Sequence, residues 1–301
     1  MPTIAEQLQQ IATIKANIKA AIEAKGETVG SDALSTYATH ISNISGGGGG
    51  GDEIIDGFVK RTLTTFEISN NVNEIGAYAF YYFTRLTSVV IPNTVTKISN
   101  FAFYHCTGLT SISIPNSVTN FGDSVFQQCN GLTSVTLPTN LTKVNNGLLR
   151  ECSALRSITI PNTVTNIGND AFRQSGLHSL TIPDSVTSTG TNILASCSSI
   201  TEVTIGSGMT SLGGYALDQC PALSTIICKS TTPPTVQSTT FGTAAARYTG
   251  RTTYNQGVNK LYVPQGCSSA YNTSYWASVL LDSTKCGFTI AELDANGNIP
   301  T

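Results

Sequence analysis

Residues 109–131 read LTSISIPNSVTNFGDSVFQQCNG, and the sequence on either side is a close copy of this stretch. Residues 86–108 read LTSVVIPNTVTKISNFAFYHCTG, and residues 132–154 read LTSVTLPTNLTKVNNGLLRECSA. Every unit has 23 residues except the fifth, which has 22, and the units begin at Leu63, Leu86, Leu109, Leu132, Leu155, Leu177 and Ile200. A fixed period of this length predicts a solenoid, in which each unit forms one coil.

Within one unit, the spacing of apolar residues predicts the path of the chain. The run L-x-x-V-x-I alternates as a β-strand does, and the proline that follows ends the strand. The V-x-x-I run predicts a second inward-facing edge, and we expect A-F-x-x-C to form a single helical or 3₁₀ turn that fills the coil with Phe. One unit buries apolar side chains worth about 10–20 kcal/mol, whereas ordering it costs about 35 kcal/mol. A coil is therefore stable only when it stacks on its neighbours.

The units resemble leucine-rich repeats of the BspA-like class, whose pattern is L-x-x-I-x-I-P-x-x-V-x-x-I-G-x-x-A-F-x-x-C. Leu149 and Leu194 depart from the pattern by replacing Phe, and Ser175 departs from it by replacing Cys. The resemblance implies an α/β repeat solenoid with a parallel strand ladder on one face and irregular turns on the other. We expect this solenoid over residues 52–222, and a degenerate repeat with a C-terminal cap over residues 223–301.

The N-terminal part has a different pattern. Apolar residues at helical spacing predict a short helical hairpin over residues 1–45, which either packs on other chains or folds back on the solenoid. Six glycines at 46–51 then predict a flexible linker. Residues 1–45 resemble the N-terminal segment of bacteriophage and prophage tail fibre proteins, through AIEAKG at 21–26 and the S-x-Y-A-x-x-I pattern at 35–41.

The second resemblance implies a protein of the virion tail, made in the host cytoplasm. Residues 1–45 would dock on phage tail or baseplate proteins or form a trimer, and the solenoid would bind a host-surface glycan or protein. The alternative is a bacterial cell-surface adhesin of the BspA-like class, which needs an export signal that we do not find in this sequence. A purely structural virion protein is a third possibility.

The chemistry-bearing residues favour a binding protein that is not an enzyme and needs no cofactor. Charged residues are 11% of the chain and the net charge is −2, which makes nucleic acid an unsuitable partner. No apolar run is long enough for membrane insertion. The histidines at 40, 105 and 178 lie in different segments, and DANGN at 294–298 predicts a turn rather than a calcium loop. We therefore expect no catalytic and no metal-binding residue.

The cysteines predict packing rather than catalysis. Five of them share one repeat position, namely Cys106, Cys129, Cys152, Cys197 and Cys220. Phe83 and Ser175 take the same position in other units, so we expect reduced, buried thiols there. Cys228 is expected in the core. Cys267 and Cys286 either form a disulfide or stay reduced.

Two surfaces remain as candidates for binding. The outward strand positions form rows of Ser and Thr, for which solvation is the simplest interpretation and a glycan the alternative. The turns of the first two units carry aromatic side chains, which stack on sugars and anchor protein interfaces. The alternative is that these side chains only cover the open first coil or contact the N-terminal hairpin. The candidate binding residues are Tyr78, Tyr81, Tyr82, Phe101, Tyr104 and His105.

Overall fold

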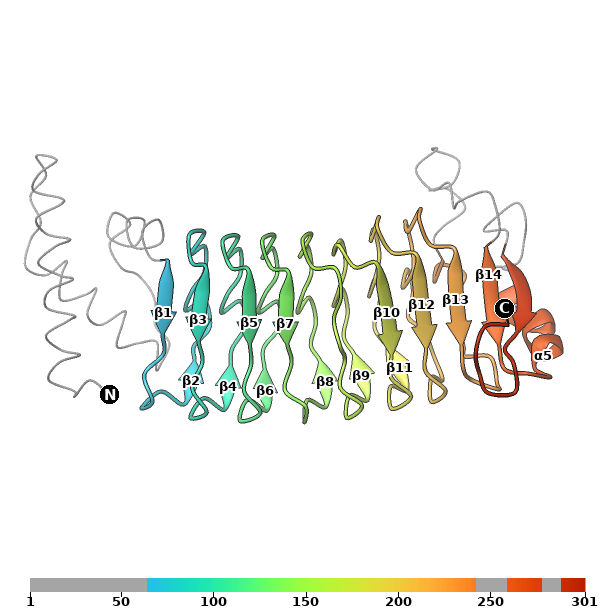
Figure 1. Cartoon of the computed structure of the whole chain (residues 1–301), viewed down its shortest axis with the longest axis horizontal. Coiled ribbons are helices and arrows are strands. Elements are labelled where there is room, and N and C mark those ends of the chain that lie inside the picture. The colour runs from blue at the N-terminus through green and yellow to red at the C-terminus, as the bar shows by residue number, and fades with distance from the viewer. Residues whose placement is uncertain (1–63, 242–258, 278–287, 301) are drawn as a thin grey trace, which may run out of the picture.

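The computed structural model describes residues 64–241, 259–277 and 288–300. In these residues the chain forms an elongated stack of coils, which lie side by side along the long axis of the molecule (Figure 1). We number the coils from the unit that begins at Leu63, and we number repeat positions from the first residue of each unit. The predicted helical hairpin over residues 1–45 and the glycine linker lie outside the described residues.

The main strand ladder runs along one face of the stack (Figure 1). Its strands pair in parallel within three sheets, and paired strands of neighbouring repeats align at equivalent positions, as in Thr65 with Ser88 and Ser111 with Ser134. Residues 155–160 of the fifth coil contain no assigned strand. The strands are β1 (Thr65–Glu67), β3 (Ser88–Val90), β5 (Ser111–Ser113), β7 (Ser134–Thr136), β10 (Ser179–Ile182), β12 (Glu202–Ile205), β13 (Thr225–Cys228), β14 (Lys260–Val263) and β15 (Thr289–Glu292). The parallel ladder predicted from the repeat is confirmed.

A second ladder of two-residue strands follows the proline turn. It contains β2 (Glu74–Ile75), β4 (Lys97–Ile98), β6 (Asn120–Phe121), β8 (Lys143–Val144), β9 (Asn166–Ile167) and β11 (Ser188–Thr189). These strands also pair in parallel between neighbouring coils. Ile75, Ile98, Val144 and Ile167 are fully buried. The V-x-x-I run therefore supplies the second inward edge that the sequence predicts.

The A-F-x-x-C segment differs from the prediction, because no residue in 64–241 lies in an α- or 3₁₀-helix. Its backbone N–H groups alternate between two kinds of acceptor. In coil two, Phe101, Phe103 and His105 donate across to the carbonyls of coil three, at 2.9–3.0 Å. The N–H groups of Ala102 and Tyr104 instead close local turns three residues back. A helix would use all of these N–H groups within the segment, whereas this turn uses half of them to bind the next coil.

Left-handed backbone makes this alternation possible. Position 16 and position 20 of each coil have φ between 53° and 64°, for example Tyr78 (61°), Tyr82 (64°) and Gly147 (60°). Only glycine adopts this region without steric cost, yet nearly all of these residues have side chains. The inter-coil hydrogen bonds that they make hold the backbone in this shape.

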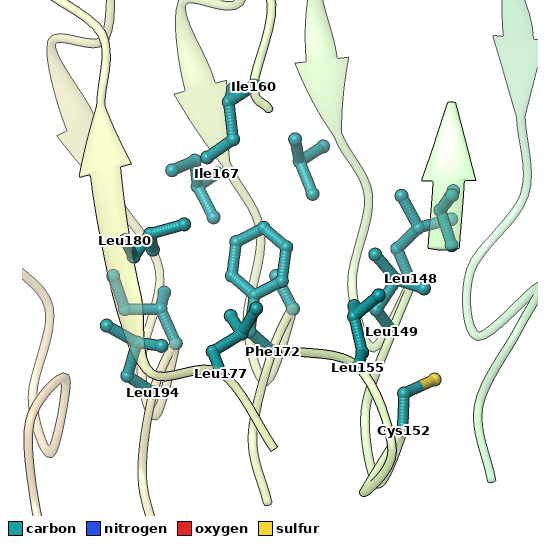
Figure 2. Close-up of a cluster of buried hydrophobic side chains, with 14 of the residues drawn as sticks. Leu148, Leu149, Cys152, Leu155, Ile160, Ile167, Phe172, Leu177, Leu180 and Leu194 are labelled. Carbon is teal, nitrogen blue, oxygen red and sulfur yellow. The ribbon is translucent and has the colours of Figure 1, made fainter. Parts of the chain in front are cut away.

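Phe side chains stack inside the solenoid at position 18. Phe80, Phe103 and Phe126 form a column, with ring centroids 4.9 Å and 5.4 Å apart and nearly parallel planes. Leu149, Phe172 and Leu194 continue this position through coils four to six, and all three are fully buried (Figure 2). The replacement of Phe by Leu therefore leaves the core closed.

The predicted cysteine column is also buried, and all the described cysteines are free thiols. Each thiol of the column donates to the backbone carbonyl of position 18 in the preceding coil, as Cys129 Sγ does to Phe103 O at 3.1 Å. The same bond recurs at Cys106, Cys152, Cys197 and Cys220. Ser175 instead contacts Cys197 Sγ at 3.4 Å. Each of these carbonyls also accepts the backbone N–H of position 21 in its own coil, as Phe103 O does from Cys106 N at 3.3 Å, so the thiol adds a second hydrogen bond that joins neighbouring coils.

The last coils differ from the repeat in length but continue the ladder. β13 pairs with β14, and β14 pairs with β15, which is the last strand of the ladder. Helix α5 (Ser268–Thr273) lies at this end of the stack beside β15 (Figure 1). Tyr271 of α5 donates to Ser230 O at 2.7 Å, and Trp276 donates to Pro234 O at 2.7 Å. Cys228 is buried as predicted, whereas Cys286 lies outside the described residues, so the proposed disulfide is untested.

Candidate binding surface on the turn face

The outward rows of the main ladder give a uniform surface. Positions 3 and 5 are exposed in coils one to six, and most carry Ser or Thr. In coil seven the outward residues are less exposed, since Glu202 is half-buried and Thr204 is buried. The side chains without a hydroxyl are Glu67, Glu202 and Val90, and Val90 is 55% exposed. Nothing along these rows gathers several functional groups at one place.

The six candidate aromatic residues do come together on the turn face. They form three short columns, in which each ring of coil one stacks on the ring at the same position in coil two. The pairs, with their centroid distances, are Tyr78 with Phe101 (5.2 Å), Tyr81 with Tyr104 (5.0 Å) and Tyr82 with His105 (4.3 Å). We call these six residues the aromatic cluster.

The columns of the aromatic cluster also contact each other sideways. Tyr81 lies 5.4 Å from Tyr78 and 4.7 Å from Tyr82, centroid to centroid. Tyr78 is 55% exposed and Tyr82 is 41% exposed, whereas the other members are half-buried. Each ring is therefore held by at least two others and presents a fixed part of its surface to a partner.

A polar ladder extends the column at position 20 into coils three and four. His105 Nδ1 lies 3.1 Å from Gln128 Oε1, an arrangement in which Nδ1 carries the proton. Gln128 Nε2 then donates to Glu151 Oε2 at 2.8 Å. Arg150 Nε pairs with the other oxygen of Glu151 at 3.0 Å. Tyr82, His105, Gln128 and Glu151 thus form one continuous column over four coils.

Sequence reasoning did not single out Gln128, Arg150 or Glu151. Each of them is an ordinary polar residue in isolation, and none belongs to a motif. The available signal was the repeat position: Gln128 and Glu151 occupy the same slot as Tyr82 and His105, and Arg150 occupies the slot of Tyr81 and Tyr104. Comparing equivalent positions along the columns, rather than residues within one unit, would have found them.

Electrostatics leave this surface uncharged on balance. Burial, with a smaller effect of the neighbouring Tyr82 and Tyr78, raises the pKa of the Tyr81 hydroxyl. Burial also raises the pKa of Tyr104, with smaller contributions from Tyr82, Tyr81 and Glu151. Both hydroxyls are therefore protonated at neutral pH and can donate hydrogen bonds.

The remaining candidate groups have structural roles. His178 Nδ1 contacts Gly176 O at 3.1 Å, and His40 lies outside the described residues. Asp294 accepts the N–H groups of Asn296 and Asn298 at 2.9 Å and 2.8 Å, which confirms the predicted turn. Within the described ranges, no group of three or more His, Cys, Asp or Glu residues could hold a metal ion. Those ranges also contain no helix that is long and apolar enough to cross a membrane.

Several solved structures are similar to this chain. A leucine-rich repeat protein of T. pallidum is 27% identical and covers 48% of this chain and 71% of its own, with a TM-score of 0.46. A leucine-rich cell surface protein of Faecalibacterium prausnitzii is 19% identical to this chain, and the match covers 77% of this chain and 88% of that protein, with a TM-score of 0.39. The pneumococcal vaccine antigen PcpA is 17% identical to this chain, and the match covers 77% of this chain and 68% of that protein, with a TM-score of 0.40.

No curated protein matches this chain. The family model of the BspA type leucine rich repeat region, in contrast, matches in six copies over residues 56–177 and 132–245. The two matches overlap and together span more than half of the chain. They include all the units in which the aromatic cluster and the polar ladder lie. The chain belongs to the BspA-type leucine-rich repeat family.

Proposed function

We propose that this protein is a non-catalytic binding protein whose aromatic cluster contacts a glycan or protein at a cell surface. The observation that carries the proposal is the preorganisation of the cluster. Six rings from two coils are locked by mutual contacts while Tyr78 and Tyr82 stay exposed. Rigid tyrosines with an apolar body and a polar tip bind partners with little loss of conformational entropy.

Display on a bacterial cell surface is the setting that we propose first. Membership of the BspA-type family supports it, because the chain resembles BspA-like surface adhesins through the repeat itself. The N-terminal residues would then serve attachment, and the solenoid would present the aromatic cluster on its first two coils, at the end nearest to the attachment.

A phage tail adhesin is the second candidate, and its support is the resemblance of residues 1–45 to tail fibre proteins. In that case residues 1–45 would dock on the tail or form a trimer. Fractionation separates the two settings. Recovery with the bacterial envelope, from cells that release no phage particles, favours surface display, whereas co-sedimentation with particles favours the tail. Light scattering of the chain with and without residues 1–45 reports whether these residues form the trimer.

We also propose that the C-terminal coils act as a cap. A solenoid needs one, because its last coil would otherwise expose a strand edge and apolar side chains. Tyr271 and Trp276 support this role, since both are fully buried and both donate hydrogen bonds to the chain just after β13. Truncation after residue 258 is expected to give soluble aggregates in light scattering, whereas a monodisperse product would contradict a capping role.

The proposed binding function is tested by comparing two tyrosines in the same repeat position. Tyr78 and Tyr215 both occupy position 16, with φ of 61° and 57°, and both are exposed, but Tyr78 belongs to the aromatic cluster. Gly147 occupies this position in coil four at φ 60°, so glycine is compatible with the fold there. Tyr78→Gly is expected to reduce binding of the labelled full chain to bacterial and epithelial cells, and Tyr215→Gly is the control. Equal binding by both variants would refute the proposal.

A further inference from the structure

The outward side chains of the turn face define a direction for a ligand. Across one coil, the aromatic cluster and the polar ladder use positions 16, 19 and 20. Along the solenoid axis, in contrast, the column at position 20 runs unbroken from the ring of Tyr82 to the carboxylate of Glu151. A ligand that uses both the rings and the polar ladder must therefore be extended and lie along the axis.

The polar groups of this surface suit a ligand that both donates and accepts hydrogen bonds. The tyrosine hydroxyls donate and accept, the Gln128 amide does both, and the Glu151 carboxylate accepts. Sugar hydroxyls offer the same dual capacity in adjacent pairs, and the C–H groups of a sugar ring pack against aromatic side chains. The column begins with aromatic rings and continues with the Gln128 amide and the Glu151 carboxylate. This order of groups is complementary to successive sugars of one oligosaccharide chain.

The charges of this surface argue against an ionic ligand. Arg150 pairs with Glu151 at 3.0 Å, and in the next coil Arg173 Nη1 pairs with Asp170 at 3.3 Å. An acidic polysaccharide could pair with these arginines only by breaking their ion pairs with Glu151 and Asp170. A basic peptide could pair with the two carboxylates only by breaking the same ion pairs. An uncharged ligand leaves both pairs intact.

We propose that the ligand of this surface is an uncharged, extended oligosaccharide that lies along the solenoid axis, from the aromatic cluster to Gln128 and Glu151. The inference rests on the proposed binding function and adds the ligand class, its direction, and Gln128 as a residue that determines specificity. Tyr78 and Tyr82 would pack against sugar rings at one end, and the polar ladder would bind hydroxyl groups at the other.

The test uses the full chain against immobilised neutral hexasaccharides of glucose, galactose, mannose, xylose and N-acetylglucosamine, with heparin and polygalacturonate as acidic probes. Binding to at least one neutral probe is expected. Tyr78→Gly should weaken it about tenfold, because a sugar ring loses the aromatic face on which its C–H groups pack. Raising NaCl from about 50 mM to about 500 mM should change the affinity less than about twofold, because no ion pair with the ligand is formed.

Gln128→Gly tests the polar end of the surface, and Gln219→Gly is its matched control. Both glutamines occupy position 20 with left-handed backbone, at φ 62° and 53°, so glycine relieves rather than strains the chain. Gln128→Gly should weaken the neutral probe at least about fivefold, as expected for about 1 kcal/mol of lost hydrogen bonding, and should change which hexasaccharide binds best. An equal effect of the two variants would overturn the assignment of the polar end.

Binding to cells that have been treated with periodate or protease distinguishes a failure of this inference from a failure of the proposed function. Periodate oxidises the vicinal diols of surface glycans, and protease removes surface proteins. Loss of Tyr78-dependent cell binding after periodate supports the glycan even if no hexasaccharide of the panel binds. Loss after protease but not after periodate, together with no binding to any neutral hexasaccharide, overturns the glycan and leaves a protein partner. Preference for the acidic probes, or cell binding that does not depend on Tyr78, also overturns the inference, and the latter result refutes the proposed function as well.

Discussion

Replacement of Phe103 tests whether stacking between coils holds this solenoid together. Phe103 is fully buried and lies between the rings of Phe80, at 4.9 Å, and Phe126, at 5.4 Å. Removing a buried Phe side chain costs about 3–5 kcal/mol, and the loss of two ring contacts of about 0.5–1.5 kcal/mol each places Phe103→Ala at the upper end of that range. Phe103→Leu should cost only about 1–2 kcal/mol, because Leu149 and Leu194 already occupy this position.

The coils that Phe103→Ala destabilises are as informative as the loss in the free energy of unfolding. Each coil contacts only its neighbours, so a cavity at coil two should uncouple coils one and two from the rest. Hydrogen exchange followed by mass spectrometry, in increasing urea, should therefore show that Phe103→Ala exposes amides of residues 64–108 before those beyond 132. The backbone bonds that pass through this junction, from Phe80 N to Ala102 O and from Phe103 N to Val125 O, should exchange first.

Phe172 provides the control for the ring contacts. It occupies the same repeat position but lies between Leu149 and Leu194 (Figure 2). Phe172→Leu should therefore cost less than Phe103→Leu, by about 1 kcal/mol, the lower end of the range for two ring pairs. The stacking argument fails if Phe103→Leu is as damaging as Phe103→Ala, if the two leucine variants are equally stable, or if exchange rises evenly over all coils.

Three further predictions concern thiols, backbone and pH. Burial raises the pKa of the Cys106, Cys152 and Cys220 thiols. A thiol reagent at pH 8 should therefore label the half-buried Cys267 in the native protein, and should label the cysteine column only after unfolding. Rapid labelling of the column in the native protein would contradict its burial. Gln174→Gly should raise the free energy of unfolding by about 0.5–1 kcal/mol in urea titration, because Gln174 has φ of 56°, and a loss of stability would refute the strain argument. Hydrogen bonds from Lys97 and Ser99 hold the pKa of the Glu74 carboxyl below its ordinary value, so the small stabilisation from Glu74 is complete at neutral pH and is lost as pH falls through the folded-state pKa. Glu74→Gln should therefore reduce the loss of melting temperature between neutral and acidic pH. An unchanged loss would assign the acid sensitivity to other groups.

The sequence predicted most of the fold because the repeat averages out local ambiguity. A single L-x-x-V-x-I run could be a strand or a buried helix segment, but several copies in register leave only the stacked arrangement. The cysteine column was predictable for the same reason, since a slot that accepts Phe83, Cys106 and Ser175 must be a packing site. The partner of each thiol was not predictable, because a carbonyl 25 or 26 residues earlier is close only after the coils are stacked.

The turn was predicted wrongly because its conformation has a weak sequence signal. Left-handed residues are normally marked by Gly or Asn, and here only Gly147 and Asn192 carry that mark. Tyr, His, Gln and Glu occupy the equivalent positions in other coils, where the A-F-x-x-C spacing favours one helical turn. Hydrogen bonding between coils outweighs this local preference, and a single unit contains no information about it.

This turn also explains how one rigid fold can carry a variable surface. At positions 16 and 20 the fold requires only a left-handed backbone, and main-chain hydrogen bonds to the next coil satisfy that requirement without the side chain. Position 18 between them must fill the core and is restricted to Phe or Leu in coils one to seven. Selection can therefore change the outward residues freely, from Tyr78 and Tyr82 in coil one to Gly147 and Glu151 in coil four, while the stack stays the same. The six aromatic side chains that lie in contact on the first two coils are the feature of this surface on which the proposed binding function rests.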